Sequence, residues 1–224
     1  MTLALKEVLQ LNKTKNTAIL WTGGKDCALA FLKAKEAGHN ITYLVTFAPE
    51  NASFKAHNLE LIQKQANAIG LPHVKLEVKA PMKESYEAAI TTLKNSYNVD
   101  ILVTGDIDEI DGHPNNWIEE RSKNTGVSVF NPLWKKDRSY LINELIENNF
   151  EVIFSLVKKP FFDEKWVGRR IDLNSIEELK KLNIDICGEN GEYHTMTLNA
   201  PFFKNQIQLN ISDIKEEEYY FYLT

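Results

Sequence analysis

The feature that most constrains this chain is a pair of adjacent glycines between a short apolar run and a helical pattern. The apolar run covers 17–21, the glycines are Gly23 and Gly24, and Lys25 and Asp26 follow them. Adjacent glycines remove the Cβ atoms that would keep a backbone from wrapping an anion. The start of a helix adds free N–H groups and the positive end of its dipole. The pattern therefore predicts a phosphate-binding loop between a first strand and a first helix.

The two charged residues of this loop have different expected uses. Lys25 adds a full positive charge, and Asp26 is placed either to cap the helix or to face a metal ion. The loop is not the common P-loop, which needs four residues between its first glycine and Gly-Lys-Ser/Thr, because here Cys27 follows Asp26. An ordinary strand-to-helix turn with a surface lysine is the alternative that this stretch leaves open.

The length and the net charge of the chain limit the classes of protein to which it can belong. The 224 residues suffice for one full domain with a small appendage. The net charge of −5, with lysines and arginines scattered along the chain, gives no field that would draw the protein to nucleic acid or an anionic membrane. The sequence has no apolar stretch of the roughly 20 residues that a membrane span needs, no signal-peptide core and only two cysteines. We expect a cytoplasmic protein that binds neither a membrane nor nucleic acid directly.

Apolar runs typical of strands alternate with amphipathic helical stretches. The expected strands are 17–21, 41–47, 73–78, 100–104, 127–130 and 151–157, and the expected helices are 26–37, 54–69, 82–97, 115–124 and 138–148. This alternation predicts an α/β fold with a doubly wound, mostly parallel, Rossmann-like sheet that helices cover on both faces. Such sheets bind ligands at the carboxyl ends of their strands, where the glycine loop falls.

The pattern changes after about residue 158. A short helix is expected over 175–182, opened by a Ser-Ile-Glu-Glu capping box that starts at Ser175, and a loop with short strands follows it. We therefore expect residues 1–158 to form a nucleotide-binding domain. Residues 159–224 are expected to form a smaller C-terminal region that packs beside its loops and closes the substrate site.

Five motifs in the same order resemble the diphthine–ammonia ligase family, a group of ATP pyrophosphatases. They are the loop at 22–27, Gly105-Asp106-Ile107, Pro132-Leu133-Trp134, Gly168-Arg169-Arg170 and the segment Cys187-Gly-Glu-Asn-Gly-Glu-Tyr-His-Thr195. The chain departs from the family pattern at His194, where the family has Glu. It departs again over 108–117, where an acidic stretch replaces a Tyr-Gln-Arg-x-Arg-Val-Glu pattern. The resemblance implies a HUP-like fold.

The resemblance also implies an activity, namely ATP-dependent amide formation. A substrate carboxylate attacks the α-phosphate of ATP, pyrophosphate leaves, and ammonia displaces AMP from the acyl-adenylate. The implied ligands are ATP, Mg²⁺, ammonium and a carboxylate acceptor, which in the family is diphthine on elongation factor 2. An adenylating ligase for a different carboxylate and an ATP-binding module without turnover stay open as alternatives. A homo-oligomer is left open as well.

Site residues follow from the same resemblance. The implied nucleotide-binding residues are Thr22, Gly23, Gly24, Lys25, Asp26, Cys27, Phe47, His57 and Gly105, the implied metal ligands are Asp26 and Asp106, and the implied catalytic residues are Lys25, Asp26, Asp106, Glu189 and Glu192. Cys27 is either a small replacement for serine or a thiol whose pKa the helix start lowers. His57 is equally well a surface histidine, and the Gly-Glu-Asn-Gly stretch is also ordinary turn sequence.

Overall fold

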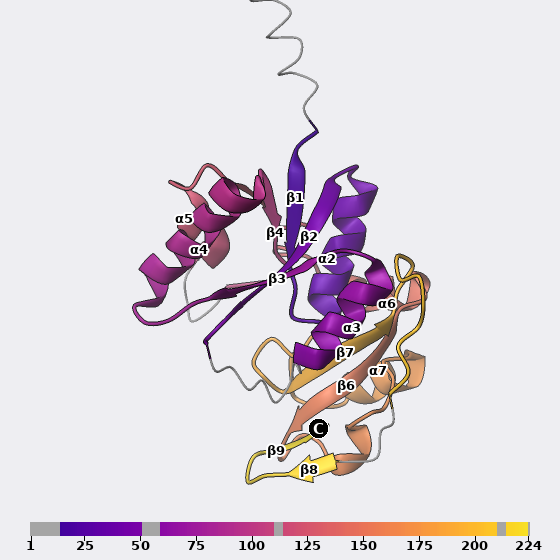
Figure 1. The fold of residues 1–224 in the computed structure, drawn as a ribbon. Helices are drawn as coiled ribbons and strands as arrows, with labels where there is room; N and C mark the ends of the chain where they lie inside the picture. The colour runs from indigo at the N-terminus through magenta and orange to yellow at the C-terminus, as the bar shows by residue number, and fades with distance from the viewer. Residues whose placement is uncertain (1–13, 51–58, 110–113, 210–213, 224) are drawn as a thin grey trace, which may run out of the picture.

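The computed structural model describes residues 14–50, 59–109, 114–209 and 214–223, which form two sheets (Figure 1). The first sheet has the order β3-β2-β1-β4-β5, and all of its neighbouring strands are parallel. Its strands are β1 (Asn16–Leu20), β2 (Asn40–Ala48), β3 (His73–Glu77), β4 (Ile101–Val103) and β5 (Ser128–Phe130). The predicted doubly wound parallel sheet is confirmed. The strand order reverses direction between β1 and β4.

Helices cover both faces of this sheet. They are α2 (Lys25–Glu36), α3 (Leu59–Ile69), α4 (Met82–Tyr97), α5 (Trp117–Ser122) and α6 (Arg138–Glu147). Successive strand residues point to opposite faces, so Ile19 packs into the core that contains α2 and α6, whereas Ala18 packs against α4 and α5. Figure 1 shows α4 and α5 on one side of the sheet and α2 and α3 on the other.

The second sheet is antiparallel, in the order β7-β6-β9-β8. It consists of β6 (Glu151–Lys158), β7 (Tyr193–Asn199), β8 (Ile214–Glu216) and β9 (Tyr220–Leu223), with the helices η1 (Glu164–Trp166) and α7 (Leu173–Leu179) beside it. The strand expected at 151–157 forms, but its place in the parallel sheet was wrong. A short apolar run after a helix looks the same whether the strand joins the first sheet or starts a second. The division of the chain at residue 158 stays a prediction.

The capping box of α7 lies three residues earlier than expected. Asp172 is the N-cap and accepts a hydrogen bond from the Ser175 backbone N at 2.7 Å, while Ser175 Oγ accepts one from the Asp172 N at 2.9 Å. Ser175 is therefore the third residue of the helix and not its cap. Asp is as good an N-cap as Ser, so both positions fit the sequence pattern.

The second sheet packs directly against the glycine loop. The Thr197 backbone N donates to the Gly23 carbonyl oxygen at 2.9 Å, and the Lys25 backbone N donates to Thr195 Oγ1 at 3.0 Å. Both threonines lie on β7, so residues far apart in sequence hold the loop between β1 and α2. In the described ranges, none of the helices combines the length and the apolar character that crossing a membrane requires.

Candidate active site

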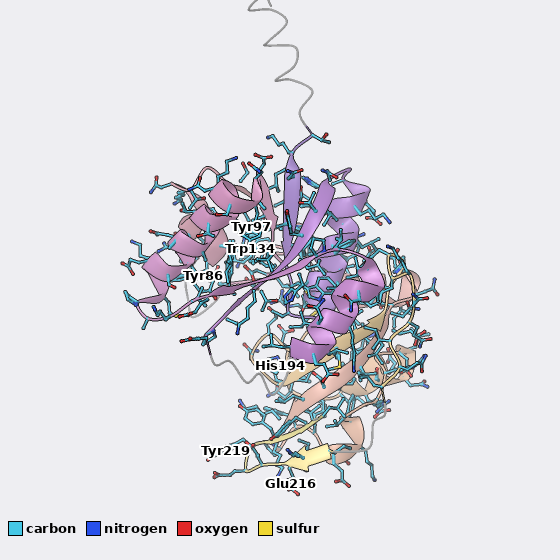
Figure 2. All side chains as sticks on the ribbon, in the orientation of Figure 1. Tyr86, Tyr97, Trp134, His194, Glu216 and Tyr219 are labelled. Atoms are coloured by element: carbon cyan, nitrogen blue, oxygen red, sulfur yellow. The ribbon has the colours of Figure 1, made fainter. Side chains whose placement is uncertain are left out.

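A cavity of about 350 Å³ opens at the carboxyl ends of β1, β2 and β4, where the strand order of the first sheet reverses. Phe47, Tyr86 and Trp117 line it. The Phe47 and Tyr86 rings meet edge to face with centroids 5.3 Å apart, and Tyr86 meets Trp117 in the same way at 6.2 Å. Figure 2 labels Tyr86 on α4 beside the sheet. This aromatic wall suits a flat heterocycle.

The glycine loop borders this cavity and has the expected conformation. Gly23 turns the chain with φ of +85°, and Gly24 is the N-cap of α2. Lys25 is the first helical residue, and its ammonium donates to Asp26 Oδ2 at 2.7 Å and Oδ1 at 2.9 Å. Burial is the largest single influence and lowers the pKa of Lys25, but Asp26, Cys187 and Glu189 together raise it more, so the pKa ends above its usual value. The loop therefore holds a buried, charged ammonium.

Asp26 and Asp106 both line the first cavity. Burial raises the pKa of Asp106 above its usual value, although Asn116 Nδ2 donates to its carboxylate at 2.8 Å. Among the described residues, the structure shows no cluster of three or more His, Cys, Asp or Glu side chains that could hold a metal ion. Mg²⁺ is usually bound by one or two carboxylates, with waters and substrate phosphates as its other ligands. The two aspartates therefore fit a magnesium–nucleotide complex better than a site built from protein ligands alone.

A second cavity, of about 260 Å³, lies on the other side of the loop. It is lined by the loop, by the start of β7 and by Cys187, Gly188, Glu189 and Gly191. Thr22, Asp26 and Glu189 border both cavities. Partial burial raises the pKa of Glu189 to about 7, and the nearby Asp26 carboxylate adds to this, while Lys25 and Arg138 act against it. The two cavities thus meet between Asp26 of the loop and Glu189 of the C-terminal segment.

The two glutamates of the C-terminal segment have different surroundings. Glu192 is buried, and its carboxylate accepts hydrogen bonds from the backbone N of Asp185 and of Asn190, both at 2.9 Å. Of the two, Glu189 lines the cavities, whereas the hydrogen bonds of Glu192 hold the backbone of the segment in place. His194 lines the second cavity, and Figure 2 labels this residue of β7. Burial lowers the pKa of its imidazole, so this side chain is neutral near neutral pH.

Comparison with known sequences places the chain in a family. Residues 15–129 match the model of the diphthamide synthase N-terminal domain, and residues 137–223 match that of the diphthamide synthase C-terminal domain. The chain belongs to the diphthamide synthase family. Proteins named diphthine–ammonia ligase from Bos taurus and Homo sapiens are each 24% identical to it over 226 residues, covering 88% of this chain and 84% of theirs. This membership indicates an enzyme, an ATP-dependent ligase.

Other relatives differ in length. The diphthine–ammonia ligase of Schizosaccharomyces pombe is 23% identical over 222 residues, and the match covers 88% of this chain but 36% of that protein. Among solved structures, a predicted subunit of a tRNA methyltransferase from Methanocaldococcus jannaschii matches 84% of this chain and 98% of its own, with 16% identity and a TM-score of 0.48.

Most residues that the resemblance implied lie together in this diphthamide synthase fold. The first cavity is lined by Thr22, Asp26, Cys27, Phe47, Gly105, Asp106 and Glu189, and the second by Thr22, Gly24, Lys25, Asp26 and Glu189. Burial raises the pKa of Cys27 to about 11, the opposite of the thiolate alternative. His57 lies outside the described residues. Sequence reasoning missed Tyr86 and Trp117, whose helical spacing looks like ordinary core, and the buried Gln65.

Proposed function

We propose that this enzyme joins ammonia to a carboxylate that it first activates with ATP, releasing AMP and pyrophosphate. The observation that carries the proposal is that two separate cavities open onto one phosphate loop. One cavity has an aromatic wall that suits adenine, and the other is lined by the C-terminal segment. Asp26 and Glu189 border both. A nucleotide and an acceptor could therefore meet at the loop without sharing a cavity.

In the first step, the acceptor carboxylate attacks the α-phosphorus of ATP and the bond to pyrophosphate breaks. Gly23, Gly24 and Lys25 hold the β- and γ-phosphates and stabilise the negative charge that develops on the leaving pyrophosphate. Asp26 and Asp106 would hold Mg²⁺, which neutralises phosphate charge when bound. Because Asp26 also pairs with Lys25, a phosphate that takes over the Lys25 ammonium leaves that carboxylate available.

In the second step, the nitrogen of ammonia attacks the activated carbonyl carbon. The bond from that carbon to the AMP oxygen breaks, AMP leaves, and the nitrogen loses one proton as the amide forms. Glu189 lies where the two cavities meet, and we assign it to orienting the ammonium or the acceptor there. Glu192 stays a predicted catalytic residue, but its contacts support a role in shaping the segment that carries Glu189.

The relatives' names support one choice of acceptor. We propose diphthine on elongation factor 2 as the acceptor and free ammonium as the nitrogen source, in the cytoplasm. Exchange of labelled pyrophosphate into ATP tests the first step by itself. We expect the exchange to need the diphthine-bearing factor and to occur without ammonium. A wild-type enzyme that exchanges pyrophosphate only with another carboxylate would favour a different acceptor, and one that turns over ATP with none of the carboxylates tested would favour the ATP-binding module.

One residue favours a second candidate acceptor. His194 lines the second cavity at the position where the family pattern has Glu, and burial lowers the pKa of its imidazole. The cavity therefore has one negative charge fewer than it would have with that Glu. Diphthine carries a trimethylammonium group that negative charge would attract, so the change favours a more anionic carboxylate. Turnover on diphthine-bearing factor should then rise in His194→Glu. Efficient amidation by the wild type, with His194→Glu no better, would exclude this candidate.

A further inference from the structure

A glutamine in the middle of α3 makes contacts that none of the sequence motifs marks. Gln65 is fully buried, at 0% exposure. Its Oε1 accepts a hydrogen bond from Trp21 Nε1 at 2.9 Å. Its Nε2 donates to the carbonyl oxygens of Gly23 at 2.9 Å and of Thr197 at 2.8 Å. One side-chain amide therefore connects α3, the residue after β1, the phosphate loop and the second sheet.

The Trp21 indole determines which way this amide faces. An indole N–H can only donate, so the Gln65 atom 2.9 Å from it is the acceptor oxygen, and the NH₂ group faces Gly23 and Thr197. In the flipped orientation, a carbonyl oxygen would face two other carbonyl oxygens, and buried polar groups without partners are costly. The surroundings thus impose one orientation, in which both amide hydrogens and the oxygen have partners.

The amide acts on the loop at the residue where the loop turns. The Gly23 carbonyl oxygen accepts hydrogen bonds from Gln65 Nε2 and from the Thr197 backbone N, both at 2.9 Å. A Cβ atom on Gly23 would lie 2.5 Å from Gln65 Oε1, so only glycine allows this approach. Two donors, one on α3 and one on β7, therefore hold this carbonyl in place. The backbone that follows, from Gly24 into α2, starts from a fixed position.

We propose that Gln65 is a positioning residue that holds the phosphate loop in its pyrophosphate-binding conformation. The inference rests on the proposed function, which assigns the phosphates of ATP to this loop. In the described part of the chain, the residues lining the two cavities do not include Gln65, so it acts through its hydrogen-bond partners and not by touching the nucleotide. Of these partners, Gly23 belongs to the loop, whereas Trp21 borders the first cavity but is itself fully buried. Its loss should weaken ligands that contact the loop more than ligands that occupy the aromatic cavity.

The test compares three ligands on one variant. Gln65→Met keeps a similar side-chain volume and removes all three hydrogen bonds. Mg·ATP, pyrophosphate and adenosine are titrated separately by calorimetry. We expect Mg·ATP and pyrophosphate to bind about tenfold more weakly or worse, and adenosine to stay within about twofold of the wild type. The matched control is Gln63→Met, at an exposed glutamine of the same helix whose amide bonds Asn67; it should bind all three ligands normally.

A second comparison separates positioning from stability. Ile62→Val alters a buried core residue of α3 and should lower the melting temperature without selective loss of pyrophosphate. If Gln65→Met does not fold, Gln65→Glu serves instead. It keeps an oxygen that accepts from Trp21 and replaces the NH₂ group that donates to Gly23 and Thr197. The same selective loss of Mg·ATP and pyrophosphate binding is expected. Unchanged pyrophosphate binding in a folded variant, or equal losses for adenosine and pyrophosphate, would overturn the proposal. A wild type that binds no Mg·ATP would overturn the proposed function and this role with it.

Discussion

The ammonium of Lys25 is buried, and both carboxylate oxygens of Asp26 accept hydrogen bonds from it. Phosphates that enter the loop would contact the same ammonium, and a hydrogen bond to a charged group contributes about 1.5–3 kcal/mol. We therefore expect Lys25→Ala to weaken Mg·ATP binding by roughly tenfold to a hundredfold and to abolish pyrophosphate release. Titration calorimetry and a pyrophosphate assay measure both effects.

The control for this substitution is Lys64→Ala, at an exposed lysine on α3 that pairs with Glu60. It should leave both readouts unchanged. Circular dichroism checks that Lys25→Ala keeps its secondary structure, since the change leaves the Asp26 carboxylate without its ammonium partner. Turnover at the wild-type rate in a folded Lys25→Ala protein would exclude the phosphate-loop role.

Asp108 links pH to the stability of the fold. Its carboxylate pairs with Lys135 and accepts from Arg138 Nη2 at 3.0 Å, and the Lys135 hydrogen bond lowers its pKa to about 2. Because the pKa of Asp108 is lower in the folded than in the unfolded protein, the ionised carboxylate stabilises the fold. This stability is fully present above the unfolded-state pKa of about 3.9 and is lost as the pH falls towards the folded-state pKa.

We expect Asp108→Asn to flatten the dependence of melting temperature on pH across that window. This difference in melting temperature should be small, because the Asp108 side chain is 35% exposed and water screens its ion pair with Lys135. Scanning calorimetry at several acidic pH values measures it, with Glu119→Gln, at an exposed glutamate of α5, as the control. A wild type and an Asp108→Asn variant with identical acid profiles would show that the pair contributes nothing.

At the scale of elements, the end of β4 lies directly against the start of α2. A Cβ atom on Gly105 would be 2.7 Å from the Asp26 carbonyl carbon and from the Cys27 backbone N. Overpacking of this kind costs about 1–3 kcal/mol. We expect Gly105→Ala to push the helix start away from β4, lowering the melting temperature and weakening Mg·ATP binding together.

Gly38, just after α2, offers a matched control for that prediction. Its φ is +80°, but a Cβ atom there would meet nothing within 4 Å. Gly38→Ala should therefore lower the melting temperature through backbone strain while Mg·ATP affinity stays unchanged. If Gly105→Ala binds Mg·ATP as tightly as Gly38→Ala does, the contact between β4 and α2 does not shape the nucleotide site.

Local patterns predicted the elements of the first sheet well. The strands and helices of the α/β pattern depend on periodicity within each segment, and the loop at Gly23, Gly24 and Lys25 depends on residues next to one another, so both can be recognised in sequence. The start of α7 was misplaced because Asp172 and Ser175 both satisfy the same capping pattern. The secondary structure that a segment forms is encoded locally. Which of two candidate N-caps three residues apart begins the helix depends on the packing around it.

At the scale of the whole molecule, the site is made by contacts between distant segments. Three features depend on how the second sheet packs against the loop. They are the strand partners of β6, the hydrogen bonds of the Gln65 amide, and the different surroundings of Glu189 and Glu192. A buried glutamine looks like any polar residue in a helical pattern, and two glutamates three residues apart look alike until one is seen accepting backbone hydrogen bonds. These features could not be predicted from spacing, because their causes lie in tertiary structure.

The central claim is that this ligase activates a carboxylate by adenylation. The most direct test is to analyse the nucleotides, pyrophosphate and protein amide formed from ATP, ammonium and diphthine-bearing elongation factor 2. The claim predicts AMP, pyrophosphate and new amide in equal amounts, with no ADP, because in the proposed mechanism the β- and γ-phosphates leave together as pyrophosphate. Stoichiometric ADP with the amide would contradict the claim, since it would mean transfer of the γ-phosphate to the carboxylate.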